Sequence, residues 1–351
     1  MTRISDRRIR FAVVGCGRIA ANHFGAIETN ADHAELVAVC DNAPAALEAA
    51  VERTGAAGFA SLTELLRDAS PRPDVIVLTT PSGLHPQQAV EAAEAGFHVM
   101  TEKPMATRWK DGLGMVDACD RAGVRLFVVK QNRRNPTLQL LKKAVSEGRF
   151  GRIYSVAVNV FWSRPQAYYD SAAWRGTWEF DGGAFMNQAS HYIDLLDWLI
   201  GPVESVQAMT ATLARNIEVE DSGVMLVKWR SGALGTVNVS MLTYPKNFEG
   251  SVTILGEKGT VRIGGVAVNE VQHWSFAEPR PEDEQLAAAS YETTSVYGFG
   301  HPLYYENVIG TLRGQAEAET SGREGLRTLE ILIAAYLSAR DGQRVNLPLE
   351  Y

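Results

Sequence analysis

The most informative segment of the chain lies near its N-terminus and runs Ile9-Arg10-Phe11-Ala12-Val13-Val14-Gly15-Cys16-Gly17-Arg18-Ile19-Ala20. All of its first six residues except Arg10 are apolar, and the run ends at a glycine, which is typical of a buried strand. The rest has the spacing G-x-G-x-x-A, with alanine in place of the third glycine of the dinucleotide fingerprint. The first glycine permits a tight turn, the second lets backbone approach a pyrophosphate, and the next helix presents N–H groups. An ordinary turn between strand and helix would show the same spacing, so the motif alone leaves both interpretations open.

The residues that follow the glycine loop favour the dinucleotide interpretation. A second strand over Glu35–Cys40 ends just before Asp41, whose carboxylate can accept both ribose hydroxyls of an adenosine and would repel a 2′-phosphate. The next residue is Asn42 and the neighbouring turn has no arginine, which favours NAD over NADP. We therefore predict a set of cofactor-binding residues here: Gly15, Gly17, Arg18, Ile19 and Asp41.

Strands and helices alternate through the first third of the chain. Further strands are expected over Asp74–Thr79, His98–Thr101 and Arg125–Val129. Helices are expected over Ile19–Glu28, Pro44–Arg53, Pro86–Ala95 and Trp109–Ala122. This β-α alternation predicts an α/β fold with a parallel, doubly wound Rossmann sheet over residues 1–132.

The pattern changes after Asn135. A helix is expected over Pro136–Glu147, a long strand over Ile153–Phe161, and a helix within Gly182–Ile200. Several β-rich runs then follow one another between residues 203 and 264, which predicts a largely antiparallel or mixed sheet in a second domain over 133–320. The polar, proline-bearing residues 277–295 predict an exposed loop. A last helix over Glu324–Arg340 lies in a segment, 321–351, that we expect to pack back on the first domain.

Composition excludes several classes of protein. The 351 residues suffice for two domains with cores of their own, and a formal net charge of -7 argues against nucleic acid or an anionic membrane as partner. No apolar stretch approaches the roughly 20 residues that span a bilayer, and the basic N-terminus lacks the apolar run of a signal peptide. The 3 cysteines have neither metal-ligand nor disulfide spacing, so we expect no metal site. A cytoplasmic protein is predicted.

Two further segments leave the carboxyl ends of expected strands, where ligands bind in open α/β sheets. In the first, which spans residues 79–85, we predict cofactor contacts by Thr79, Ser82 and His85, although a capped turn at a helix start would use the same residues. The second is Thr101-Glu102-Lys103-Pro104. A lysine there, pointing at a nicotinamide, could polarise a substrate hydroxyl or carbonyl.

Glu-Lys-Pro in a chain with this glycine loop resembles the glucose–fructose oxidoreductase and inositol dehydrogenase family (Gfo/Idh/MocA). The resemblance continues through residues 130–136, Trp174-Arg175 and residues 182–194, and so covers nearly the whole chain. It implies that Glu102 holds the nicotinamide ribose and that Lys103 is catalytic and contacts substrate. It also places three more residues along the cofactor: Gln131, Trp174 and Arg175.

The segment 182–194 carries the second motif of the family. Asn187 and His191 are four residues apart, so on a regular helix they would share one face. Relatives often have aspartate and histidine at these positions, the histidine serving as acid/base. Because the amide of Asn187 cannot take a proton, proton transfer is expected to fall on His191, with Lys103 assisting.

The residues 161–170 and 174–178 resemble the subgroup of the family that oxidises UDP-N-acetylglucosaminuronic acid (UDP-GlcNAcA) at C3, a step towards the diacetamido-mannuronic acid of lipopolysaccharide O-antigens. A nucleotide-sugar acid brings a pyrophosphate and a carboxylate, for which Arg133 and Arg164 are suitable partners. Tyr168 and His301 either line the sugar or uracil pocket or pack between the domains. The predicted substrate-binding residues are Lys103, Arg133, Phe161, Arg164, Tyr168, Asn187, Gln188, His191 and His301.

The resemblance also implies a homodimer or homotetramer formed through the second-domain sheet, an active site between the domains, and an aminotransferase that acts on the keto product. Two alternatives stay open. One is a dehydrogenase of the same family that acts on inositol or a simple aldose. The other is a non-catalytic, dinucleotide-binding regulator, against which the presence of Lys103 and His191 argues.

Overall fold

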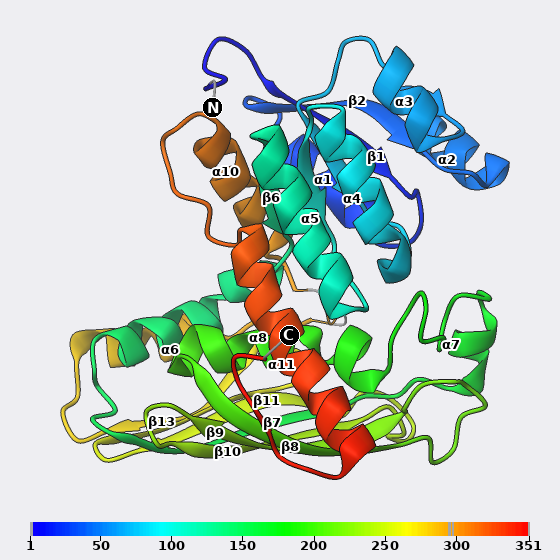
Figure 1. Ribbon diagram of the computed structural model, residues 1–351. Coiled ribbons are helices and arrows are strands. Elements are labelled where there is room, and N and C mark those ends of the chain that lie inside the picture. The colour runs from blue at the N-terminus through cyan, green and yellow to red at the C-terminus, as the bar shows by residue number, and fades with distance from the viewer. Residues whose placement is uncertain (1–2, 294–295, 297, 350–351) are drawn as a thin grey trace. The chain divides into compact units, whose positions relative to one another are not determined.

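The computed structural model describes residues 3–293, 296 and 298–349. The chain forms two compact units, each built from two separate stretches (Figure 1). Unit 1 comprises Met1–Lys130 with His301–Leu329, and unit 2 comprises Gln131–Gly300 with Glu330–Tyr351.

Unit 1 contains a six-stranded parallel sheet in the order β3-β2-β1-β4-β5-β6. The strands are β1 (Ile9–Val14), β2 (Ala34–Cys40), β3 (Ala57–Phe59), β4 (Val75–Leu78), β5 (His98–Thr101) and β6 (Leu126–Val128). The predicted Rossmann sheet is thus confirmed. The strand order reverses between β1 and β4, which makes the carboxyl ends of these strands the expected ligand site of an open α/β sheet.

The helices of unit 1 begin and end where local chemistry favours it. They are α1 (Ala20–Thr29), α2 (Pro44–Thr54), α3 (Leu62–Asp68), α4 (His85–Glu94), α5 (Trp109–Ala122) and α10 (His301–Leu312). For example, α2 starts with proline in its first turn and ends at Gly55 in the left-handed region (φ 68°). Ser61 caps α3 by accepting a hydrogen bond from the backbone N–H of Glu64 at 3.2 Å.

Helix α10 was not predicted from the sequence. It packs against α1, and its residues Tyr304, Tyr305 and Val308 belong to the same buried core as Phe11 and Val13 of β1. The core of unit 1 therefore uses a helix that follows the first stretch of unit 2, Gln131–Gly300, in the chain.

Unit 2 contains an eight-stranded mixed sheet in the order β13-β12-β11-β7-β10-β9-β8-β14, as the sequence predicted. Its strands are β7 (Ile153–Phe161), β8 (Val203–Ala211), β9 (Ser222–Trp229), β10 (Leu234–Ser240), β11 (Glu249–Gly256), β12 (Gly259–Gly264), β13 (Glu270–Phe276) and β14 (Val345–Asn346). The pair β7 and β10 is parallel, and the other described pairs are antiparallel.

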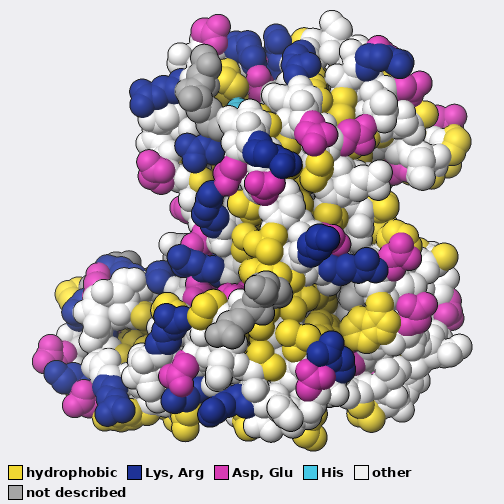
Figure 2. Space-filling model, in the orientation of Figure 1, with side chains coloured by type: hydrophobic (Ala, Val, Ile, Leu, Met, Phe, Trp, Pro, Cys, Tyr) yellow, Lys and Arg dark blue, Asp and Glu magenta, His cyan; other side chains and the backbone are white. Residues whose placement is uncertain are grey.

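The helices of unit 2 include α6 (Pro136–Ser146), the short α7 (Gln166–Asp170) and α8 (Ser190–Leu195). Figure 1 shows α6 and α8 over one face of the sheet. The long α11 (Gly322–Asp341) begins in unit 1 and ends in unit 2. Dark blue and magenta side chains, of opposite charge, are interspersed over the face shown in Figure 2. Among the described residues no helix combines the length and the low polarity needed to cross a bilayer.

The prediction of an exposed loop over residues 277–295 was wrong in part. A 3₁₀-helix forms at Pro281–Gln285 and is followed by α9 (Leu286–Ala289). The reason is a tertiary ion pair: both carboxylate oxygens of Asp283 accept hydrogen bonds from the guanidinium of Arg149, at 2.6 and 2.7 Å. Residues 294 and 295 lie outside the described part of the chain.

Candidate active site

The glycine loop lies between β1 and α1, as the motif requires. Gly15 has φ +95°, and a Cβ built on it would lie 2.8 Å from the backbone N of Thr80 and 2.9 Å from the carbonyl of Thr79. A side chain therefore fits neither the conformation nor the space. Gly17 is exposed, and a Cβ there would meet nothing within 4 Å. The backbone at Gly17 is thus open to a ligand, and Ala20 starts the helix directly after it.

Asp41 follows β2 and supports the glycine loop. Its Oδ2 accepts a hydrogen bond from the backbone N–H of Cys16 at 2.7 Å, and Oδ1 accepts one from the N–H of Ala43 at 2.8 Å. A carboxylate has further acceptor capacity for ribose hydroxyls. Burial, followed by the nearby Asp41 charge, raises the pKa of the Cys16 thiol to about 11. Cys16 is therefore a thiol at neutral pH and a structural residue of the loop.

We expect Asp41→Asn to raise the NADH dissociation constant about tenfold. The ratio of the NADPH to the NADH dissociation constant should fall by more than about tenfold. The amide keeps the shape of the side chain but removes an acceptor and the negative charge, and a hydrogen bond to a charged group contributes roughly 1.5–3 kcal/mol. NADH and NADPH dissociation constants, measured by fluorescence titration, check this. Asp32→Asn, on the exposed turn before β2, is the control. An unchanged preference would contradict the assignment of Asp41 to the adenosine ribose.

Thr79, Ser82 and His85 follow β4 beside the glycine loop. The Thr79 hydroxyl donates to the carbonyl of Gly15 at 2.5 Å and also lies 3.0 Å from that of Val14. The ring nitrogens of His85 lie 3.1 Å from the carbonyl oxygen of Pro104 and 2.9 Å from that of Thr80. Burial lowers the pKa of His85, so the ring is neutral at pH 7 and its single N–H can donate to only one of these two carbonyl oxygens. Cofactor contacts by these residues stay predictions.

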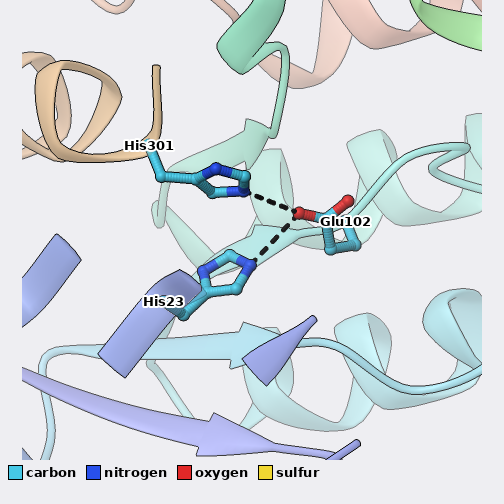
Figure 3. A group of neighbouring side chains, drawn as sticks. All are labelled: His23, Glu102 and His301. Atoms are coloured by element: carbon cyan, nitrogen blue, oxygen red, sulfur yellow. Dashed lines mark hydrogen bonds and ion pairs between the residues drawn. The ribbon is translucent and has the colours of Figure 1, made fainter. Parts of the chain in front are cut away.

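Glu102 and Lys103 come directly after β5. The Glu102 carboxylate is buried, and its Oε2 accepts a hydrogen bond from the backbone N–H of Lys103 at 3.1 Å. Its Oε1 lies 3.1 Å from His23 Nε2 and 3.6 Å from His301 Nε2 (Figure 3). Burial alone would raise the pKa of Glu102, but the hydrogen bond from His23 and the nearby His301 ring outweigh it and hold that pKa well below the usual range.

In unit 2, Asn187 and His191 lie on an interrupted helix. Residues Ala184–Gln188 form a π-helical turn, and α8 starts only at Ser190. The assumption of one regular helix was therefore wrong, because a π turn shifts the residues after it around the axis. His191 is buried, and its Nε2 lies 3.1 Å from Gln131 Nε2. The Asn187 amide donates to Asp181.

Arg133 has a carboxylate partner within unit 2. Its guanidinium donates two parallel hydrogen bonds to Asp194, each 2.7 Å long, and both side chains are buried. Such a bidentate pair fixes the turn at Gln131–Arg134 to α8, one turn after His191. A contact between Arg133 and substrate stays a prediction.

Four of the predicted site residues form one cluster in unit 2. Arg164 Nε donates to Gln188 Oε1 at 3.0 Å, Gln188 Nε2 donates to the Tyr168 hydroxyl at 3.2 Å, and Arg175 Nη1 donates to the same hydroxyl at 2.5 Å. The Arg175 guanidinium also stacks over the Trp174 ring, 4.5 Å from its centroid. Phe161 ends β7, and Trp162 follows it beneath Arg164. The cluster presents two guanidinium groups beside aromatic rings.

Sequence reasoning missed the residues that support the predicted ones. Asp194 and His23 were not predicted, although Asp194 lies three residues after His191 and His23 lies in the first turns of the helix after the glycine loop. Glu220 was also missed. It lies under the π turn, where it accepts hydrogen bonds from Phe185 N–H and the Tyr336 hydroxyl, at 2.9 and 2.8 Å. No local pattern marks this glutamate, because its partners are distant in sequence.

Comparison with known proteins identifies the class. Residues 9–130 match the family model described as "Oxidoreductase family, NAD-binding Rossmann fold", and residues 142–347 match "Oxidoreductase family, C-terminal alpha/beta domain". The chain belongs to the Gfo/Idh/MocA oxidoreductase family. The predicted family and the NAD-binding domain are thus confirmed.

Within the family, two solved structures are highly similar over the full chain. The WlbA dehydrogenase of Chromobacterium violaceum, in complex with NADH and UDP-GlcNAcA, is 72% identical with a TM-score of 0.95, over 100% of this chain and 99% of the other. The WlbA dehydrogenase of Bordetella pertussis, in complex with the same two ligands, is 67% identical with a TM-score of 0.96, over 99% and 100%. The D-apiose dehydrogenase of Paraburkholderia graminis is 28% identical over 99% of this chain and 92% of its own length.

Proposed function

We propose that this protein oxidises the C3 hydroxyl of UDP-GlcNAcA to the 3-keto sugar with NAD⁺, a step towards the diacetamido-mannuronic acid of O-antigens. The observation that carries the proposal is the full-length identity of 72% and 67% to two dehydrogenases crystallised with NADH and UDP-GlcNAcA. The residues of each unit that the motifs single out support the proposal in the ways given below.

The residues of unit 1 fit a dinucleotide. The open backbone at Gly17 and the start of α1 suit the pyrophosphate, with Arg18 and Ile19 beside it. Asp41 has acceptor capacity for the adenosine ribose, and the ionised Glu102 for the nicotinamide ribose. When bound, NAD⁺ accepts a hydride from the substrate.

His191 is proposed to remove the O3 proton, and Lys103 to hydrogen-bond O3 and stabilise the developing alkoxide. Gln131 Nε2 donates to His191 Nε2 at 3.1 Å and so orients the ring, and the O3 proton would take the place of this hydrogen bond when it is transferred to Nε2. Asn187 keeps the family position but supplies only hydrogen bonds, since an amide does not titrate. The ketone formed is the substrate that an aminotransferase would take next.

The cluster around Arg164 is proposed to bind the anionic parts of the substrate. Arg164 and Arg175 offer planar donor groups that match a carboxylate or a phosphate, and both are already oriented by Gln188 and the Tyr168 hydroxyl. Substrate contacts by Phe161, Arg133 and His301 are part of the same proposal.

The outer face of the unit 2 sheet is proposed to join copies of this chain into a cytoplasmic homodimer or homotetramer. Large apolar side chains of successive strands are exposed on that face: Met209, Val224, Leu226, Leu234 and Leu255. Figure 2 shows hydrophobic side chains along its lower border, where Figure 1 places this sheet. An apolar patch of this kind marks an interaction surface.

The proposed activity is tested by following absorbance at 340 nm with NAD⁺ and a panel of UDP-sugars, inositols and free aldoses. An aminotransferase trap removes the ketone so that an unfavourable equilibrium does not hide turnover. We expect NADH from UDP-GlcNAcA. Turnover of a free sugar without turnover of UDP-GlcNAcA would instead favour an aldose or inositol dehydrogenase. NADH binding without turnover of any compound would favour a regulator.

A further inference from the structure

Glu102 lies at the centre of a buried polar network that joins three elements of unit 1 (Figure 3). His23 comes from α1, Glu102 from the end of β5, and His301 from the start of α10. His23 is 0% exposed, Glu102 is 6% exposed and His301 is 3% exposed. Tyr305, one turn after His301, completes the network: its hydroxyl lies 2.8 Å from His23 Nδ1.

The direction of each hydrogen bond follows from the protonation states. Burial lowers the pKa of His23, so its ring is neutral at pH 7 and carries one N–H. The Glu102 carboxylate is ionised and can only accept, so the His23 proton is on Nε2 and is donated to Glu102 Oε1 at 3.1 Å. Nδ1 must then accept, and the Tyr305 hydroxyl donates to it. Burial raises the pKa of Tyr305 well above its ordinary value, which keeps that hydroxyl protonated.

The network fixes both oxygens of the carboxylate. Oε1 is held by His23 and faces His301 Nε2, while Oε2 accepts from the backbone N–H of Lys103. We propose that Tyr305, His23 and His301 are positioning residues that keep Glu102 ionised and in one orientation, ready to accept the hydroxyls of the nicotinamide ribose. The inference rests on the role of Glu102 under the proposed function.

The consequence is a pH profile that a purely structural role would not produce. The titratable groups that face Glu102 are His23 from α1, His85 from α4, His301 and Tyr305 from α10, and the neighbouring Lys103. With His23 in place the pKa of Glu102 is depressed, so the carboxylate stays ionised as pH falls through the neutral range. Without the His23 N–H, one of the two histidine contacts that offset the effect of burial is lost, so the pKa of Glu102 rises from its depressed value. Cofactor affinity should then fall as pH falls.

The test measures NADH dissociation constants by fluorescence titration between pH 5.5 and 8.5. For His23→Phe, which keeps the ring packing, we expect binding at pH 6 to be at least tenfold weaker than at pH 8, against less than about twofold for the parent protein. His23→Gln restores an amide N–H close to the position of Nε2 and should recover much of the flat profile. Tyr305→Phe removes a single oxygen and should give a smaller shift in the same direction.

Glu102→Gln separates this inference from the function on which it rests. We expect Glu102→Gln to weaken NADH binding equally at every pH, because the amide does not titrate. In the double variant His23→Phe, Glu102→Gln, the pH dependence of NADH binding seen for His23→Phe alone should be absent. If Glu102→Gln binds NADH normally, the proposed cofactor role of Glu102 fails. If it binds weakly but His23→Phe loses affinity equally at every pH, the positioning role alone is overturned. Loss of binding after EDTA dialysis that Zn²⁺ restores would also overturn it, because the network would then be a metal site.

Discussion

Lys103→Ala is expected to lower kcat for NADH formation from UDP-GlcNAcA by about a thousandfold or more, while the NADH dissociation constant stays within about twofold. Positioned proton-transfer and charge-stabilising groups typically contribute factors of 10²–10⁴. Lys103 follows β5, and its backbone N–H donates to Glu102. The backbone of Lys103 is therefore fixed at the carboxyl edge of the sheet. Alanine keeps that N–H and removes the side chain beyond Cβ, including the ammonium group.

The matched control is Lys110→Ala, which removes an exposed lysine from the first turn of α5. Its kcat should equal that of the parent protein. Initial rates at saturating NAD⁺ and nucleotide sugar give kcat, and fluorescence titration gives the NADH dissociation constant. Retained turnover in Lys103→Ala would remove Lys103 from the mechanism. A parallel loss of NADH affinity would instead assign it to cofactor binding.

The second large effect is expected in the glycine loop. Substitution of Gly15 should lower the stability of the protein, whereas substitution of Gly17 should weaken NADH binding. Gly15→Ala should destabilise the protein by more than about 2 kcal/mol, since the left-handed backbone strains a side chain and the new Cβ meets the backbone of Thr79 and Thr80. Gly17→Ala should leave the melting temperature within about 2 °C, because its Cβ meets nothing. It should nonetheless weaken NADH binding about a hundredfold, since a methyl group lies where the pyrophosphate approaches.

Thermal unfolding and NADH titration of both variants check the pair. Equal stability of Gly15→Ala and the parent would contradict the close contact with the β4 loop. Normal NADH binding by Gly17→Ala would mean that the pyrophosphate is held elsewhere. The two variants serve as controls for each other, because each adds a single methyl group and the two positions are only two residues apart.

Sequence reasoning succeeded where a local pattern decides the structure. The parallel strands follow from short apolar runs that end at Gly15, Thr79 and Glu102, and parallel strands bring their carboxyl ends to one edge. It failed at α10, because most of that helix is buried and it shows little amphipathic period. His301 was singled out as a substrate residue, but its position beside Glu102 depends on that helix and could not be foreseen.

In the site of unit 2, too, local motifs were predicted and tertiary contacts were not. Asn187 and His191 were found from their motif, but the π turn between Ala184 and Gln188 has no sequence signature. The contacts that orient the site come from distant residues: Arg133 reaches Asp194, and Glu220 reaches Tyr336. Hydrogen bonds of this kind depend on tertiary packing, which periodicity does not encode.

Helix α10 also determines when unit 1 can finish folding during synthesis. The ribosome releases β1 to β6 first, but the core around Phe11 and Val13 is completed only by Tyr304, Tyr305 and Val308, after all of residues 131–300 have emerged. At roughly 5–20 residues per second that delay is on the order of ten seconds or more. During this interval the nascent sheet lacks helix α10 and with it His301. The core of the nucleotide-binding unit therefore cannot be complete until the first stretch of unit 2, Gln131–Gly300, has been synthesised.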